Sequence, residues 1–255
     1  MRIGTTIGIA TAGKPAASGG TPAGPLKVSV EADTDVYEDT GATDPVENGD
    51  FAVRWLDATN GLQLAGEGDT NQPQWYSSSA NWNNKPYIDY YAYWFEQHVV
   101  DVTGMSTSTD HTIYALHRGT IPLDGQPIMH TSNLSCWYKT TSGPSGFDDG
   151  TLRTSTYWPG TFSGLWVFSF NGAGGGAKIH VNGWEAYGSP LTYTPQQLTG
   201  NLTLMTTGGT PSAGSNYASY GELLLFRWYD VLHTNAERVA IETELRTKYA
   251  FPDWS

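Results

Sequence analysis

The chain is short of cysteine, of long apolar runs and of positive charge, and each shortage excludes a class of protein. Cys136 is the single cysteine in 255 residues, so no disulfide can form within the chain. Secreted domains often carry disulfides, and this absence favours folding in a reducing cytoplasm. We interpret Cys136 as a buried structural thiol.

Apolar residues do not form long runs. No segment approaches the roughly 18 consecutive apolar residues of a membrane-spanning helix. Gly and Thr separate Ile3, Ile7 and Ile9, so the first residues lack the apolar run of a signal peptide. We therefore expect no membrane insertion, and a protein that stays inside the cell or leaves it within a larger particle.

Positive charge is scarce, with 13 Lys and Arg against 25 Asp and Glu and a formal net charge of −12. Such a chain repels the polyanionic backbone of nucleic acid, so we expect no nucleic-acid binding. An acidic surface is compatible with binding calcium or the basic surface of a partner protein. Five loop aspartates supply hard oxygen ligands but form no calcium-binding motif: Asp33, Asp35, Asp39, Asp148 and Asp149. We expect no cofactor, with calcium as an alternative that no motif supports.

Short catalytic motifs are also missing. The chain has no Gly-x-Ser-x-Gly elbow, no phosphate-binding loop and no dinucleotide-binding fingerprint. None of the six histidines forms a His-x-x-x-His pair or a Cys/His cluster, so no zinc site is visible. The sequence therefore predicts that the chain is not an enzyme.

Glycine and proline are concentrated in residues 1–26, which contain little else but small residues. This composition cannot bury enough surface to fold alone. One interpretation is a disordered tail, because chain ends are usually loose. The other is an extended arm that becomes ordered on a partner, whose anchoring side chains would be Arg2, Ile3, Ile7, Ile9 and Lys14.

From Leu26 onward, short apolar segments recur between turn signals. Residues alternate in period 2 around Val28 and Val30, and the pattern returns in 51–56, 113–117, 165–170, 179–181, 202–204 and 223–229. Asn182-Gly183 is a strong tight-turn signal. Aromatic residues make up 13% of the chain, which is ample for a core. The pattern predicts an all-β domain over residues 27–255.

One helix is expected near the C-terminus. Thr234, with Glu237 three residues later, forms a capping box, and Pro252 ends the element. Ile241, Leu245 and Tyr249 lie on one helical face. We expect this face to pack on the outside of the β domain.

Three C-terminal stretches follow one another as a set: Gly221–Asp230, Asn235–Arg238 and Leu245–Tyr249. They resemble the last strand, the "AER" helix and the "KYG" close of concanavalin A-like lectin/glucanase domains of the laminin G-like group, which also occur in phage virion proteins. Weaker matches follow in the expected order through about residues 27–251, including the Ile179–Gly183 hairpin. Ala250 replaces the glycine of the close, and the family's "F-D-G" is absent from 87–104.

The resemblance implies two antiparallel sheets in a jelly-roll sandwich, with the helix outside. It does not fix the function, because this fold serves sugar binding, calcium-dependent protein binding, glycoside hydrolysis and virion structure. Hydrolases of the fold carry a Glu-x-Asp-x-x-Glu strand. The nearest match is Glu31-Ala32-Asp33, but Val36 stands where the second Glu belongs.

Aromatic and amide residues gather between positions 75 and 94. Aromatic rings stack on the apolar faces of pyranose rings while amides bind hydroxyls, so this segment is a candidate glycan or partner contact. The alternative is a mixture of core and interface residues. The candidates are Trp75, Tyr76, Trp82, Asn83, Tyr91 and Tyr93.

The leading hypothesis is a non-enzymatic bacteriophage virion structural protein, a head decoration or a tail or fibre component, assembled in the host cytoplasm. The arm of residues 1–26 would attach it to other virion proteins, and the sandwich would project outward. The alternative is a carbohydrate-binding module for cell-surface glycans, and a glycoside hydrolase is less favoured. A homo-oligomer fits a particle component, but no residue pattern selects its symmetry.

Overall fold

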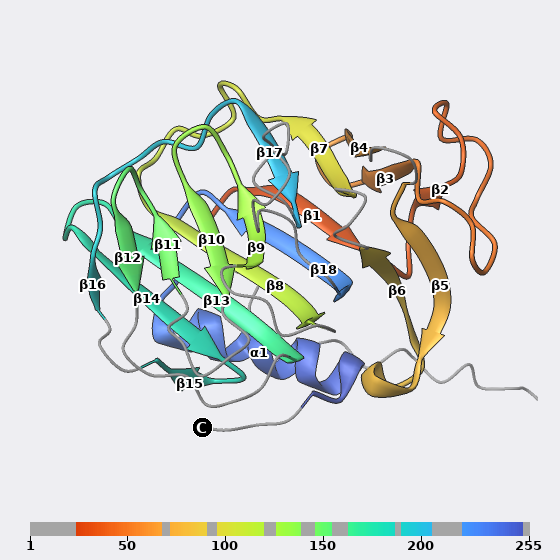
Figure 1. The fold of residues 1–255 in the computed structure, drawn as a ribbon. Coiled ribbons are helices and arrows are strands. Elements are labelled where there is room, and N and C mark those ends of the chain that lie inside the picture. The colour runs from red at the N-terminus through yellow and green to blue at the C-terminus, as the bar shows by residue number, and fades with distance from the viewer. Residues whose placement is uncertain are drawn as a thin grey trace, which may run out of the picture.

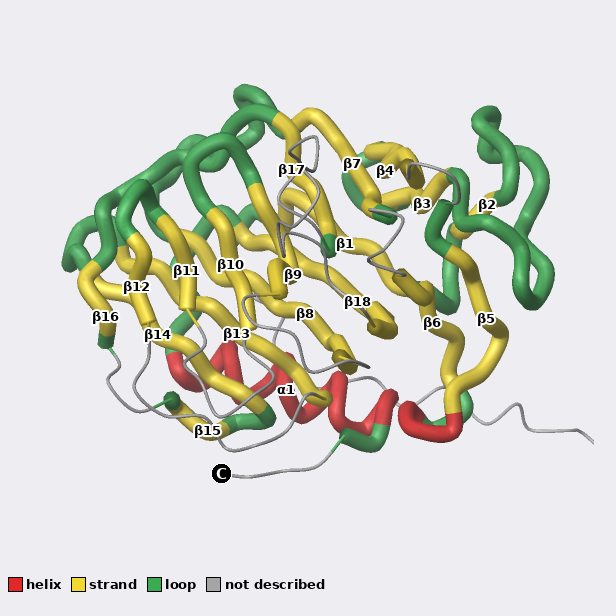
Figure 2. Tube along the Cα trace, in the orientation of Figure 1, coloured by secondary structure: helices red, strands yellow, loops and turns green. Residues whose placement is uncertain are grey.

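The computed structural model describes residues 24–67, 72–90, 96–119, 126–138, 146–154, 163–186, 190–205 and 221–251. These residues form two antiparallel sheets that face each other, with one α-helix outside them (Figures 1 and 2). The predicted fold class, an all-β antiparallel sandwich with a C-terminal helix packed outside, is confirmed. Arg2, Ile3, Ile7, Ile9 and Lys14 lie outside the described residues, so the arm stays a prediction.

The first sheet is built around three nine-residue strands in its middle. Its spatial order is β15 (Trp184–Glu185), β14 (Gly176–Val181), β13 (Ser163–Asn171), β8 (His111–Gly119), β18 (Gly221–Tyr229), β6 (Lys85–Tyr90) and β5 (Gln74–Ser79). Two further strands pair outside this path, β1 (Leu26–Glu31) with β18 and β16 (Leu191–Thr192) with β14. Both β6 and β1 pair with the same side of β18: β6 with residues 221–223 and β1 with residues 225–229.

The second sheet consists of shorter strands. Its order is β12 (Leu152–Thr154), β11 (Gly146–Asp148), β10 (Ser135–Tyr138), β9 (Gln126–His130), β17 (Asn201–Leu204), β7 (Gln97–Asp101), β4 (Leu62–Glu67), β3 (Arg54–Asp57) and β2 (Val36–Tyr37). A 3-10 turn, η1 (Ala80–Trp82), follows β5, and the helix α1 (Asn235–Tyr249) follows β18.

The central strands of the first sheet are buried on both faces, which explains their continuous apolar runs. In β8, Ile113 and Ala115 point into the core between the sheets, whereas Tyr114 and Leu116 pack on the helix side. Cys136 lies in the inter-sheet core as predicted, and burial raises the pKa of its thiol well above the usual value.

The helix α1 begins and packs as its sequence predicts. The Thr234 side chain accepts from the Glu237 backbone, and the Glu237 side chain accepts from the Thr234 backbone, which completes the capping box. Ile241, Leu245 and Tyr249 are buried in a second apolar cluster against the outer face of the first sheet. Among the described residues, no helix is both long enough and apolar enough to cross a membrane.

An ion-pair cluster fixes the end of β1 to β18 and to the last turn of α1. Glu31 pairs with Arg227 and Lys248 and accepts a hydrogen bond from the Tyr249 hydroxyl. Lys248 also lies 2.9 Å from Asp33. Burial by itself would raise the pKa of Glu31, but the charge of Arg227 and the hydrogen bonds from Lys248 and Arg227 outweigh it, so the pKa is lowered. Glu31 and Asp33, the nearest match to a hydrolase strand, are thus engaged in ion pairs.

Glu31→Gln should lower the free energy of unfolding at pH 7 by about 1–3 kcal/mol, because Arg227 and Lys248, both partly buried, lose the anion that they share. The folded-state pKa of Glu31 lies below its ordinary value of 4.5. The stabilisation is therefore complete above that value and is lost as the pH falls through the lower folded-state value. Urea denaturation at pH 7 and pH 3 measures the difference.

The matched control is Glu47→Gln, which removes the same charge at an exposed residue and should change the free energy of unfolding by less than about 0.5 kcal/mol. An equal loss for Glu31→Gln at both pH values would contradict the electrostatic origin of the effect.

Candidate functional site

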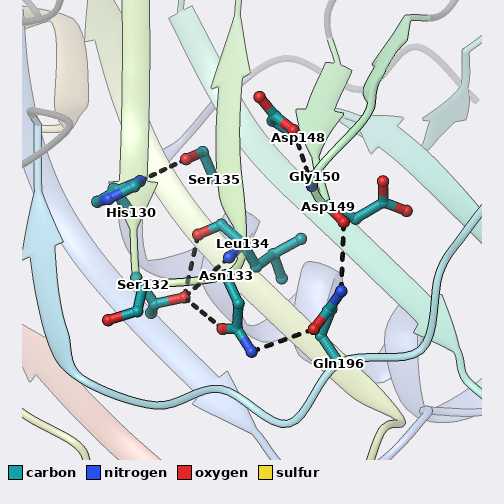
Figure 3. Close-up of a pocket in the computed structure, with 10 residues that line it drawn as sticks. His130, Ser132, Asn133, Leu134, Ser135, Asp148, Asp149, Gly150 and Gln196 are labelled. Atoms are coloured by element: carbon teal, nitrogen blue, oxygen red, sulfur yellow. Dashed lines mark hydrogen bonds between the residues drawn. The ribbon is translucent and has the colours of Figure 1, made fainter.

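A pocket of about 340 Å³ opens where two turns of the second sheet meet the segment 193–199 (Figure 3). The turns are those between β9 and β10 and between β11 and β12. Nearly every lining residue is polar: His130, Thr131, Ser132, Asn133, Leu134, Ser135, Asp148, Asp149, Gly150 and Gln196. Apart from the imidazole of His130, no aromatic side chain from the described part of the chain lines it.

The β9–β10 turn holds its shape through Thr131. The Thr131 backbone N–H donates to the Leu134 carbonyl over 2.8 Å, and the Leu134 N–H donates to the Thr131 hydroxyl over 3.1 Å. Both residues are buried, so the turn has a fixed base. Ser132 is left exposed at the tip, where its side chain borders the pocket.

Two amide side chains span the pocket. The Asn133 amide donates to the Gln197 carbonyl over 2.5 Å and to Gln196 Oε1 over 3.3 Å. The Gln196 amide in turn donates to the Asp149 carbonyl over 3.2 Å, as Figure 3 shows. The Gln196 main chain is fixed as well, because its carbonyl lies 2.8 Å from Nε2 of the buried His111. These bonds hold amide groups in place before any ligand arrives.

The adjacent residues Asp148 and Asp149 have opposite roles. Asp149 is 3% exposed, accepts from the Thr194 N–H over 2.6 Å and lies 3.5 Å from Arg153 Nε. It therefore joins the β11–β12 turn to the 193–199 segment. Asp148 is exposed. Within the described part of the chain, its carboxylate accepts one hydrogen bond, from the Gly150 N–H over 2.9 Å. One of its carboxylate oxygens is thus free for a ligand.

His130 and Ser135 are cross-strand partners at the pocket wall, with Nδ1 and Oγ 2.5 Å apart. Burial lowers the pKa of His130, and the nearby charge of Asp148 opposes this only in part, so the imidazole is mainly neutral at pH 7. A Ser–His hydrogen bond is one element of a nucleophilic site. In the described residues, however, no hydrogen bond to Nε2 orients the imidazole as a general base requires.

The described residues predicted from the aromatic segment lie elsewhere, on β5 of the first sheet and in the η1 turn that follows it. Trp75 is half-buried and its indole N–H donates to the Ala32 carbonyl over 2.6 Å. Tyr76 stacks on Tyr87. Trp82 is 1% exposed, so its ring is core rather than a ligand surface. Asn83 is exposed, and its amide donates to the Lys248 carbonyl over 3.3 Å.

Tyr91 and Tyr93 lie outside the described residues.

The pocket residues were missed because they come from three separate segments that only the fold brings together. Asp148-Asp149-Gly150 was a visible turn signal, but its acidity suggested calcium. Within the described ranges, no group of three or more His, Cys, Asp or Glu side chains is arranged to hold a metal ion.

Comparison with known proteins gives matches at the level of structure alone. No protein-family model matches the chain, and no curated protein matches it either. A Trypanosoma rangeli sialidase in complex with sialic acid has 12% identity and a TM-score of 0.53, covering 86% of this chain and 32% of the sialidase. Botulinum neurotoxin type C, which interacts with two ganglioside molecules, has 12% identity and a TM-score of 0.53, covering 75% of this chain and 48% of the toxin chain.

A third match is the binding domain of botulinum neurotoxin serotype D/C, with 10% identity, a TM-score of 0.52 and coverage of 86% of this chain and 52% of that one. This chain therefore spans a third to a half of the length of the chains it matches. At such identities the likeness establishes a shared β-sandwich, in agreement with the fold that the family resemblance implied.

The prediction that the chain is not an enzyme is contradicted, because sialidases, of which this chain spans about a third, are among the structures that share its fold. That prediction relied on short sequence motifs. Catalytic groups in a β-sandwich can come from different strands, and such an arrangement leaves no local signature in the sequence.

Asp149→Ala should lower the free energy of unfolding by about 2–4 kcal/mol, because it leaves the Thr194 N–H and Arg153 without their acceptor. Faster amide hydrogen exchange in 193–199 should accompany the loss. Asp148→Ala, one residue away but exposed, is the matched control and should cost under about 1 kcal/mol. Equal costs for the two variants would contradict the anchoring role of Asp149.

Proposed function

We propose that this chain is a carbohydrate-binding β-sandwich domain whose ligand site is the pocket of Figure 3. One observation carries the proposal: a preorganised polar pocket that presents a free carboxylate oxygen of Asp148 beside fixed amide and hydroxyl groups. Sugar hydroxyls act as both donors and acceptors, and a carboxylate is a strong acceptor for them. Groups held by other bonds lose little entropy when they bind.

The volume and the fold also support this function. A pocket of about 340 Å³ falls within the range of small-molecule sites, roughly 300–1,000 Å³. The sialidase solved with sialic acid and the ganglioside-binding neurotoxin share the fold, although this likeness does not carry their ligands over to the chain.

The charge of the site favours a neutral glycan over an acidic one. Asp148 is the free charged group at the rim, whereas Arg153 is already paired with Asp149. The net charge of −12 adds a general repulsion for anions. We therefore infer a neutral oligosaccharide as the ligand class.

Asp148→Asn should weaken binding of a neutral oligosaccharide at least about tenfold, because a neutral amide is a weaker acceptor than a carboxylate. A glycan array with the full-length chain selects the ligand, and calorimetry measures the affinity. Asp44→Asn removes an equal charge from an exposed residue in the distant β2–β3 connection and should leave the affinity unchanged. Absence of binding to any neutral glycan, or unaltered binding by Asp148→Asn, would contradict the proposal.

The virion hypothesis is compatible with glycan binding, because a particle component can display a binding sandwich. It rests on the Gly/Pro-rich composition of residues 1–26. The laminin G-like assignment and the virion location belong to this hypothesis and stay predictions.

Cross-linking mass spectrometry on the native particle or cell extract tests that hypothesis. Links from the Met1 amine and Lys14 to a capsid or tail protein are expected if the arm is an anchor. A protease-sensitive arm without links to another protein would contradict it.

A further inference from the structure

A second row of polar and aromatic side chains crosses the outer face of the first sheet, on elements that do not line the pocket. Asp89 of β6 is the register partner of Gln74 on β5 and of Glu222 on β18, and Glu222 is the partner of Arg118 on β8. Two residues further along, Tyr76 pairs with Tyr87. Because residues two apart share a sheet face, Gln74, Tyr76, Tyr87 and Asp89 lie on one surface.

Glu222, at one end of this row, is held in place by an ion pair and two hydrogen bonds. It is 6% exposed, lies 2.9 Å from Arg118 Nη1, and accepts from the Trp82 indole over 2.7 Å and from the Ser79 hydroxyl over 3.2 Å. Both carboxylate oxygens therefore have partners inside the protein. Arg118 uses Nη1 for this ion pair, and its side chain is 34% exposed.

Asp89 differs from Glu222. Its carboxylate is half-buried, and within the described part of the chain it has a hydrogen bond from the backbone N–H of Tyr90 but no bond to a side chain. Burial in the first place, and then the charge of Glu222, raise the pKa of Asp89 to about 6, while Arg118 opposes the shift. A carboxylate kept partly dehydrated and unpaired destabilises the fold, and such groups concentrate at binding sites.

The aromatic part of the surface is rigid. The rings of Tyr76 and Tyr87 stack with centroids 5.1 Å apart and planes inclined by 16°. The Tyr76 hydroxyl donates to Gln74 Oε1 over 3.0 Å, which fixes the ring beside Asp89. β5 is the outermost strand of the sheet, and its outer edge is bonded to the segment 49–52, for example where the Trp75 N–H donates to the Asp50 carbonyl over 2.8 Å. Tyr76, the member of the stack on β5, is half-buried rather than enclosed.

We propose that Gln74, Tyr76, Tyr87 and Asp89 form a second ligand site, which binds the ring of a neutral sugar. The apolar face of the ring lies on the tyrosine stack, and two of its hydroxyls donate to the Asp89 carboxylate, which then gains the partners it lacks. A neutral ligand fits because Glu222 and Asp89 repel an anion. The proposal shares its ligand class with the proposed function but does not depend on the pocket.

The site should bind in a pH-dependent way. The charged and titratable groups around Asp89 are Glu222 and Arg118 on the neighbouring strands, the two tyrosines, and Glu96 close to Tyr76. Ionised Asp89 accepts hydroxyl hydrogen bonds more strongly than the protonated acid does. With a pKa of about 6, roughly a tenth of the carboxyls are ionised at pH 5, so binding there should be about tenfold weaker than at pH 7.5.

Calorimetry on the full-length chain with uncharged tetrasaccharides of glucose, galactose, mannose and N-acetylglucosamine tests the proposal. Carried out in the Asp148→Asn background, it separates this site from the pocket. In this background, where the pocket binds at least about tenfold more weakly, we expect one site of unchanged affinity at pH 7.5, whose affinity falls about tenfold from pH 7.5 to pH 5. Asp89→Asn should remove most of this binding and all of its pH dependence. Tyr76→Ala should abolish binding, whereas Tyr76→Phe, which keeps the ring, should retain it.

The outcomes are distinguishable from failure of the proposed function. Loss of all binding in Asp148→Asn, with unchanged binding in Asp89→Asn, would overturn the second site and leave the pocket intact. Binding that depends on Asp89 but not on Asp148 would support the second site and overturn the pocket. Thermal unfolding at pH 7.5 checks folding: Asp89→Asn should raise Tm, and a lowered Tm would contradict the unpaired state of the carboxylate.

Discussion

The structure depends on covering the first sheet on both faces. Strands β8, β13 and β18 carry apolar side chains on both sides, so the second sheet alone cannot bury them. Helix α1 covers the remaining face, and its capping box and apolar stripe position it there. Beyond the helix contact, on β5 and β6, the outer face becomes polar and aromatic, with Tyr76, Tyr87 and Asp89. The same constraint that requires the helix therefore also defines which part of this face can meet a ligand.

The fold could be predicted because its signals are local. Alternation around Val28, Ile113 and Ile179 marked β1, β8 and β14, and the Thr234–Glu237 pair marked the start of α1. Each pattern spans only a few residues, and the structure has the expected strand or helix at each of them. The order of strands within each sheet was not accessible in this way, because it depends on pairings between distant segments such as β1 and β18.

The pocket could not be predicted, because only pairings between distant segments bring its residues together, whereas Tyr76 of the second site was among the candidates that the sequence offered. Asn133, Asp149 and Gln196 are separated by 16 and 47 residues, yet hydrogen bonds join them in one pocket. Aromatic content also misleads, since Trp82 and Tyr76 lie six residues apart but Trp82 is core and Tyr76 is half-buried on the outermost strand β5. Sequence shows how many rings a segment contains. Only the register shows which ring faces solvent.

The cluster around Glu31 has a topological consequence. Its carboxylate joins the end of β1 to the last turn of α1, while the start of β1 is held where the Asp230 N–H donates to the Pro25 carbonyl. Glu31 thus links residues of β18 and α1 that come 196 and 217 positions later in the chain. One carboxylate therefore closes the covalent path from β1 through both sheets to the last turn of the helix.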